Sequence, residues 1–158
     1  MAGEFYEIYT DEEHIIVEYP DKAVTMGISG CIGIGILNHK LKRGYLKHHG
    51  GRNKYSDSLI KRAINDAQNI GDLEVALAGN IPLSEEDAKI NEEDFYKSLN
   101  ESREHGKWAL EMIKSKGINA KKIQNHLQIY PSKDCYNILI DTEKGKIEVE
   151  KVNLGEEE

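Results

Sequence analysis

The chain contains the stretch Cys31-Ile32-Gly33-Ile34-Gly35-Ile36, in which isoleucines alternate strictly with small residues. A two-residue period is typical of a β-strand, with the isoleucines on one face and the small residues on the other. After a short polar stretch, the segment from Arg43 to His49 is expected to return as the hairpin partner of this strand. The sequence therefore predicts an antiparallel hairpin.

The rest of the chain places strands on both sides of a helical middle. Further strands are expected over residues 14–19, 23–28, 73–78, 123–130, 136–141 and 147–152. One helix is expected from the capping residues Ser56 and Asp57 to about residue 70, and another through the apolar stripe of 108–113 to Gly117. The acidic stretch 84–100 is expected to be a solvated helix or a partly ordered excursion. This layout indicates an α+β domain built of layers.

Length and composition indicate the class of protein. At 158 residues and 39% hydrophobic, the chain is expected to form a single domain over residues 1–155, followed by an acidic tail at 156–158. The formal net charge of -7 argues against nucleic acid as a partner. No stretch approaches the roughly 18 apolar residues of a membrane span, and no leader pattern opens the sequence. We therefore expect a cytoplasmic protein without membrane insertion.

The cysteines and histidines do not form a metal-binding pattern. Cys31 and Cys135 are far apart and belong to no CxxC motif, so neither a disulfide framework nor a thiolate zinc site is predicted. The histidines outside the hairpin are scattered without ligand spacing. The glycine run 27–35 contains neither GxGxxG nor GK[ST]. No metal and no cofactor are predicted.

The segment from Val24 to Cys31 resembles the signature in which chemoreceptor glutamine deamidases of the CheD type present their nucleophile. Thr25 stands six residues before Cys31 and His48 stands seventeen after it, as expected for the threonine, cysteine and histidine of that family. Gly44, four before the histidine, also fits. The resemblance is specific over residues 24–48, and it implies a layered α/β/β sandwich of mixed sheets with two or three helices. This fold would be shared with the catalytic domain of cytotoxic necrotizing factor toxins.

The resemblance also implies a reaction. Cys31 would be the nucleophile, His48 its base and Thr25 the residue that orients the imidazole, while Ser29 and Gly30 would form the substrate and oxyanion region. A carboxamide is a poor electrophile, so attack on it requires a thiolate and a neighbouring imidazole that takes the thiol proton. The implied activity is that of a protein-glutamine glutaminase, which converts Gln to Glu and releases ammonia.

The resemblance further suggests partners. The implied substrates are the cytoplasmic helices of chemotaxis receptors, and a phosphatase or adaptor could regulate the enzyme. The chain departs from the family pattern at Ser29-Gly30, where Gly-Ser is usual, and at Gly50-Gly51, where Leu-Pro is expected. Two other interpretations therefore stay open: a non-catalytic CheD-like protein that binds a signalling partner, and a Cys-His amidohydrolase with another substrate.

The register of the hairpin decides which histidine faces the cysteine. If Gly35 pairs with Gly44, then Cys31 faces His48, with Cβ atoms about 4.5–5.5 Å apart. A register one residue longer pairs Cys31 with His49 and gives a cleaner apolar face. The family spacing selects His48, and His49 is the alternative base.

Overall fold

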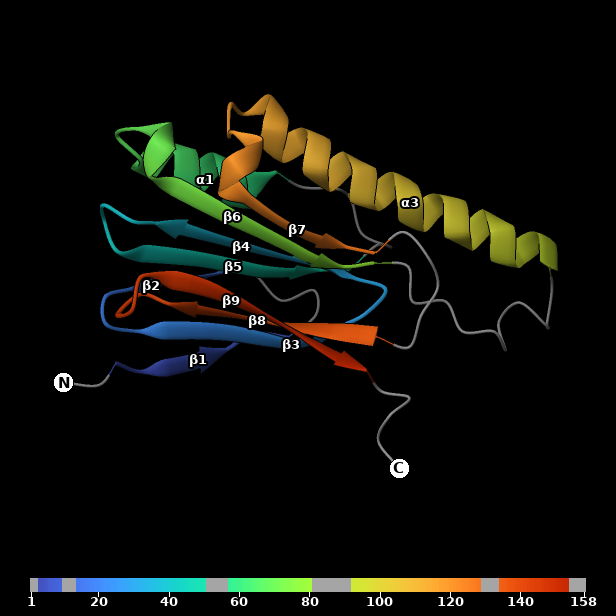
Figure 1. Cartoon of the computed structure of the whole chain (residues 1–158), viewed down its shortest axis with the longest axis horizontal. Helices are drawn as coiled ribbons and strands as arrows, with labels where there is room; N and C mark the ends of the chain where they lie inside the picture. Colours follow the sequence, from blue (N-terminus) through green and yellow to red (C-terminus); the bar gives the residue numbers. More distant parts are fainter. Residues whose placement is uncertain (1–2, 10–13, 51–56, 81–91, 129–133, 154–158) are drawn as a thin grey trace.

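In the part of the chain that the structure describes, two β-sheets lie face to face, and two α-helices cover the outer face of one of them (Figure 1). The computed structural model describes residues 3–9, 14–50, 57–80, 92–128 and 134–153. Within them, one helical layer lies on two mixed sheets, so the predicted α+β layered class is confirmed. None of the helices in these ranges is long and apolar enough to cross a membrane.

The strand order shows why both sheets are mixed. The five-stranded sheet has the order β2 (Ile15–Glu18), β5 (Arg43–His49), β4 (Ile32–Asn38), β6 (Leu73–Gly79) and β7 (Ile123–Leu127). The four-stranded sheet has the order β1 (Phe5–Glu7), β3 (Lys22–Ile28), β8 (Asp134–Asp141) and β9 (Lys146–Asn153). The pairs β1–β3 and β6–β7 are parallel, and all other pairs are antiparallel.

The alternation of β4 divides the interior into two cores. Ile32, Ile34 and Ile36 point toward α1 (Ser58–Asp66) and α3 (Glu92–Ser115), where they join a helix-side core. A second core lies between the sheets and is made of residues from both sheets and of the residue that follows β1. It contains Ile8, Val17, Ala23, Ile28, Leu37, Leu46, Ala76, Ala78, Tyr136, Ile138, Ile140 and Ile147. Burial of apolar surface on both faces of the five-stranded sheet fixes it as the middle layer.

The small-residue face of β4 is packed against the second sheet. A Cβ atom at Gly33 would lie 2.4 Å from Cδ1 of Ile28 and 2.8 Å from Cδ1 of Ile138. On the neighbouring strand, a Cβ atom at Gly44 would lie 2.6 Å from Cγ2 of Ile140. These glycines therefore bring the two sheets together by admitting isoleucine side chains.

Neither hairpin register considered from the sequence is the observed one. Gly44 pairs with Leu37, not with Gly35 or Ile36, so the register is longer than both alternatives. The reason lies in the turn: the Asn38 Oδ1 atom accepts hydrogen bonds from the backbone N–H groups of Lys40 and Leu41, and Lys42 has φ 55°. This side-chain-capped turn ends the strands at Asn38 and Arg43, which fixes the register.

The helices differ from the predicted ones in length. α1 ends at Asp66, because residues 70–72 form a 3₁₀ turn capped by the Asn69 side chain. The expected cap residue Asp57 makes no capping hydrogen bond, and Ser56 lies outside the described residues. The acidic residues 92–100 belong to the first half of α3, which is a single 24-residue helix through to Ser115. Residues 84–91 and the expected tail 156–158 are likewise outside the described ranges.

The strand β1 was not predicted from the sequence. It is short and exposed, and only its parallel pairing with β3 places it in the sheet. The next residue, Ile8, is buried and donates its backbone N–H to the carbonyl oxygen of Val24 at 3.0 Å. Ile8 thereby reaches the neighbourhood of Thr25.

Candidate active site

Thr25 and His48, which the sequence placed in one site, are in contact between the two sheets. Thr25 lies on β3 of the four-stranded sheet and His48 on β5 of the five-stranded sheet. The Oγ1 atom of Thr25 is 2.8 Å from the Nδ1 atom of His48, and the two residues are 0% and 2% exposed. The predicted contact of threonine with imidazole is therefore present in the structure.

The hydrogen bonds of Thr25 determine the tautomer of His48. The Thr25 hydroxyl donates to the backbone carbonyl oxygen of Ile8 at 2.9 Å. A hydroxyl has one proton to donate, so its contact with His48 requires that Nδ1–H of the ring be the donor. A neutral ring protonated at Nδ1 carries its lone pair at Nε2. His48 is thus held in the tautomer in which Nε2 accepts a proton.

His49, the alternative base, lies on the other side of the sheet. It pairs with Ile32, whereas His48 pairs with Gly33. The His49 Nδ1 atom is 3.2 Å from Nε2 of His105 on α3, and both rings lie near the ring of Trp108. Burial, and then the neighbouring His49, lower the pKa of His105 to about 4. His49 therefore contributes to the packing of α3 on the sheet, away from Thr25.

Cys31 is the residue immediately before β4 and is partly exposed. Because Gly33 stands opposite His48, the two-residue period of the strand places Cys31 in the row diagonal to the histidine. Diagonal neighbours in such a pair are about 7–8 Å apart, a distance within reach of an aromatic ring such as that of histidine. The directly facing arrangement of Cys31 and His48 expected from the sequence is therefore wrong. Cys31 is instead diagonal to His48.

The turn at Gly79 and Asn80 holds the loop that carries Cys31. The backbone N–H of Asn80 donates to the carbonyl oxygens of Ser29 at 2.6 Å and Cys31 at 2.8 Å. Asn80 has φ 75° and Gly79 has φ 100°, conformations that asparagine and glycine tolerate best. A Cβ atom at Gly79 would lie 2.5 Å from the Cys31 carbonyl oxygen. In the sequence, this pair is visible only as the end of the apolar run 73–78.

The side chain of Asn80 joins this loop to α3. Its Nδ2 atom donates to the backbone carbonyl of Ser102 at 2.5 Å, and its Oδ1 atom accepts from the Ser102 hydroxyl. A Cβ atom at Gly106, one turn further along α3, would lie 2.6 Å from this Nδ2 atom. Gly106 therefore allows the helix to approach, and we name Gly79, Asn80, Ser102 and Gly106 the loop clamp.

The clamp also orients the peptide group of Gly30. In a trans peptide the C=O and N–H groups point in opposite directions, so binding of the Ser29 carbonyl to Asn80 turns the Gly30 N–H away from it. Gly30 is exposed, and its N–H makes no hydrogen bond within the described parts of the chain. This N–H is a donor beside Cys31, in the segment Ser29-Gly30 for which an oxyanion region is expected.

The second cysteine has a different environment. Cys135 is buried on β8, where it pairs with Val152 of β9. In the ranges that the structure describes, no group of three or more histidine, cysteine or acidic side chains is arranged to hold a metal ion. The chemistry that the described site can support is that of a thiol, an imidazole and backbone donors.

The comparisons with known proteins do not assign a family. No protein-family model and no curated protein matches the chain. Among solved structures, the chain is similar to the crystal structure of YlmD from Geobacillus stearothermophilus, with a TM-score of 0.44 and 8% sequence identity. The match covers 80% of this chain and 60% of YlmD, so the chain spans less than two thirds of that protein. A similarity of this degree carries no argument about function.

Proposed function

We propose that the chain is a cysteine-dependent amidohydrolase that deamidates a protein glutamine, with Cys31 as nucleophile and His48 as base. The observation that carries the proposal is the pair of hydrogen bonds from Ile8 through Thr25 to His48. They give a buried imidazole the tautomer that a general base needs, in the role that acidic or amide residues fill in other cysteine and serine hydrolases. The resemblance of residues 24–48 to CheD-type deamidases adds support.

The first half of the reaction forms a thioester. His48 Nε2 takes the proton of the Cys31 thiol, and the thiolate sulfur attacks the carboxamide carbon of glutamine. The negative charge on the tetrahedral oxygen is stabilised by the Gly30 N–H. The protonated imidazole then gives its proton to the amide nitrogen, the C–N bond breaks, and ammonia leaves.

The second half regenerates the enzyme. His48 takes a proton from a water molecule whose oxygen attacks the thioester carbon. The C–S bond breaks, the sulfur leaves as thiolate and is reprotonated by the imidazole, and glutamate remains on the substrate. The net reaction consumes one water and releases one ammonia for each glutamine. Thr25 touches neither substrate nor sulfur in this scheme and acts by positioning His48.

Alkylation of the cysteines tests the activated nucleophile. Iodoacetamide labelling is followed by mass spectrometry across pH, with the buried Cys135 as the internal reference. We expect Cys31 to react about tenfold faster near pH 6.5 in the wild type than in the His48→Ala variant. The matched variant His49→Ala should keep the fast reaction, since His49 lies on the helix side.

Two results would decide against this proposal. If Cys31 reacts no faster than an ordinary thiol, the non-catalytic interpretation is correct. If His49→Ala and not His48→Ala abolishes the fast reaction, the base is assigned wrongly. For the substrate, cytoplasmic helices of chemotaxis receptors are incubated with the wild type and with Cys31→Ala, and glutamines are searched for conversion to glutamate. Fast labelling without conversion would point to an amidohydrolase with another substrate.

A further inference from the structure

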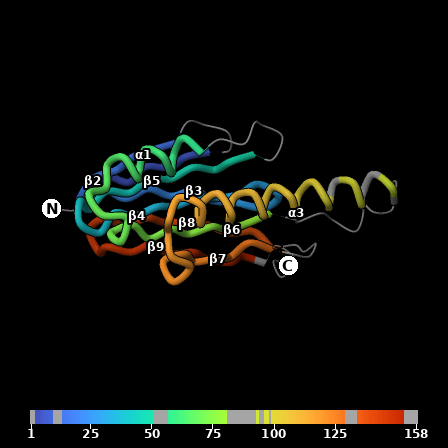
Figure 2. The backbone as a smooth tube through the Cα atoms, turned by 90° about the horizontal axis from the view of Figure 1, so that it is seen from above, coloured from blue at the N-terminus to red at the C-terminus, as the bar shows by residue number. Residues whose placement is uncertain are grey.

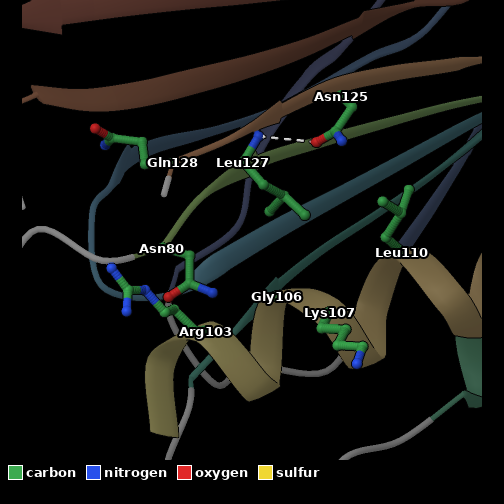
Figure 3. A pocket seen from close by; sticks show the side chains of 8 residues that line it. All are labelled: Asn80, Arg103, Gly106, Lys107, Leu110, Asn125, Leu127 and Gln128. Carbon is green, nitrogen blue, oxygen red and sulfur yellow. Dashed lines mark hydrogen bonds between the residues drawn. The ribbon is translucent and has the colours of Figure 1, made fainter. Parts of the chain in front are cut away.

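A pocket of about 290 Å³ lies between α3 and β7, beside the loop clamp (Figure 3). α3 contributes Arg103 and Lys107 to its wall, and β7 contributes Asn125 and Leu127. Among the described residues that line the pocket none is acidic, although acidic side chains outnumber basic ones in the chain by 28 to 21. The pocket is therefore a basic site on an acidic protein, a charge distribution that favours an anionic ligand.

The polar groups of this pocket are mostly hydrogen-bond donors. Arg103 is exposed and forms no ion pair or hydrogen bond within the described parts of the chain. Within the described residues, the ammonium group of Lys107 has one ionic contact, a long one of 4.0 Å with Glu111, and both side chains are solvated. Asn125 uses its Oδ1 atom to accept from the backbone N–H of Leu127, so its amide protons are the part left to bind a ligand. Guanidinium, ammonium and amide donors together suit a carboxylate.

The apolar part of the wall restricts the ligand further. Leu110 and Leu127 face the pocket along with the polar groups, as Figure 3 shows. A bare inorganic anion would not cover these side chains, whereas a carboxylate on a short aliphatic stem would bury them. The glutamate or aspartate side chain of a polypeptide has this composition.

The pocket and Cys31 lie at the same end of the five-stranded sheet. Gly79, at the end of β6, pairs with Ile32 on one side and with Leu127 on the other. Asn80 is both a wall of the pocket and the donor that holds the carbonyl of Cys31. A polypeptide bound at this end of the sheet could therefore contact the pocket and the nucleophile at once.

We infer that the pocket binds an acidic side chain of the same polypeptide that presents its glutamine to Cys31, an inference that rests on the proposed function. The pocket is on the helix side of the sheet, whereas Thr25 and His48 lie between the sheets. Packed layers are about 10 Å apart and an extended chain advances about 3.3 Å per residue. The acidic residue is therefore about three or more positions from the glutamine, and not adjacent to it.

Binding to an inactive variant tests the pocket separately from catalysis. The protein is full-length Cys31→Ala, and the probes are fluorescein-labelled peptides of alanine and serine with one glutamine. A glutamate is placed next to the glutamine, four positions away or nowhere, and affinity is measured by fluorescence anisotropy. We expect the peptide with glutamate four positions away to bind about tenfold more tightly than the other two.

Charge reversal at the pocket provides the matched comparison. Arg103→Glu in the Cys31→Ala background should remove the preference for the acidic peptide. Lys114→Glu changes the same charge on the exposed surface of the same helix, outside the pocket lining, and should leave the preference unchanged. Circular dichroism of each variant verifies that the fold is retained. If Arg103→Glu and the parent protein bind all peptides alike, the inference is wrong.

The remaining outcomes distinguish failure of the pocket inference from failure of the proposed activity. They also distinguish a carboxylate on a polypeptide from one on a small molecule. If the acidic preference depends on Arg103 but the wild type deamidates none of the peptides, the pocket stands and the proposed activity fails. If the wild type and the Arg103→Glu variant with Cys31 intact deamidate all peptides equally well, the activity stands and the pocket inference fails. Free glutarate is titrated in parallel: tight binding of glutarate with no added affinity for the peptide would assign the pocket to a small dicarboxylate and overturn the polypeptide ligand.

Discussion

The His48 Nδ1 atom lies 2.8 Å from the Thr25 Oγ1 atom, and the Thr25 hydroxyl is itself bound to the carbonyl of Ile8. The contact joins the two sheets, because Thr25 belongs to one and His48 to the other. Groups from three places in the two sheets thus converge on one imidazole: strand β3, strand β5 and Ile8, the residue that follows strand β1. An orienting residue placed in this way can be tested without touching the cysteine.

Replacing Thr25 with valine keeps the size and branching of the side chain and removes its oxygen. We expect Thr25→Val to lower the rate of Cys31 alkylation near neutral pH by about tenfold, because the His48 tautomer is no longer fixed. The protein should also lose about 1–3 kcal/mol of stability for each buried group left unpaired. Thr25→Ser, which retains the hydroxyl, should stay close to the wild type in both alkylation and thermal denaturation. Equal behaviour of the valine and serine variants would remove Thr25 from the site.

The loop clamp predicts an unusually large effect at Gly79. A Cβ atom there would lie 2.5 Å from the Cys31 carbonyl oxygen, and the backbone of Gly79 has φ 100°. The substitution Gly79→Ala must therefore displace the loop that carries Cys31. Gly145 is the control, since it has φ 69° but a Cβ atom there would meet no atom of the described residues within 4 Å. We expect Gly145→Ala to cost about 1–2 kcal/mol from backbone strain alone. Gly79→Ala should cost more and should also slow Cys31 alkylation, as measured by urea denaturation and labelling.

The contact between the sheets predicts a difference between two glycines that both face isoleucines. A Cβ atom at Gly44 would lie 2.6 Å from Cγ2 of Ile140, a methyl group attached directly to a stiff β-branched carbon. A Cβ atom at Gly35 would find its nearest neighbour, Cγ2 of Ile138, at 3.2 Å. We expect Gly44→Ala to destabilise the protein by about 1–3 kcal/mol and Gly35→Ala by less, in denaturant titrations. The opposite order would mean that the sheets separate more readily at Gly44 than the packing indicates.

The buried pair of His49 and His105 predicts that stability depends on pH. The pKa of His105 is lowered from 6.5 to about 4 in the folded protein, with burial as the main cause. Between these values the unfolded chain binds more protons, so stability contributed by the neutral ring is present above pH 6.5 and decreases as the pH falls toward 4. Glutamine cannot be protonated in this pH range. We therefore expect the free energy of unfolding of His105→Gln to fall by about 1–3 kcal/mol less than that of the wild type between pH 6.5 and 4.

A second histidine serves as the control for this effect. His126 lies on β7 beside the ring of Tyr136 and does not belong to the cluster of His49, His105 and Trp108. Denaturation curves of His126→Gln at several pH values should retain the loss of stability between pH 6.5 and 4 that His105 causes, because His105 is unchanged in this variant. If His105→Gln and the wild type show the same dependence, burial of this pair does not contribute to acid sensitivity.

The layered α+β class could be predicted because the apolar pattern is local. The alternation in β4 and the apolar run of β6 require a sheet that is buried on both faces. Figure 1 shows the helices above this sheet and the second sheet below it, and Figure 2, seen from above, shows α1 and α3 lying over the strands. By contrast, β1 has little apolar character, and it is a strand only because β3 offers it a parallel edge. Such pairing cannot be read from a segment alone.

The hairpin register shows the same limit at the candidate site. The sequence correctly predicted two strands, over residues close to the observed ones, but a register depends on the turn that joins them. The cap that Asn38 makes with Lys40 and Leu41 lengthened the pairing, and it moved Cys31 from a facing to a diagonal position relative to His48. A small difference in a turn thus changes the geometry of a site at the other end of the strands.

The amino-acid sequence by itself determined which residue types are available for chemistry, namely Thr25, Cys31 and the adjacent His48 and His49, and that they lie on predicted strands. Only the tertiary structure separated the two histidines, because neighbours in a strand point to opposite faces and each face packs against a different layer. It also brought Asn80 into hydrogen-bonding contact with Cys31 and placed Arg103 and Asn125 around one pocket, arrangements of segments far apart in the chain that no local pattern encodes. The physical reason is that hydrophobic periodicity specifies which face of an element is buried, whereas packing and hydrogen bonding between elements specify what it is buried against.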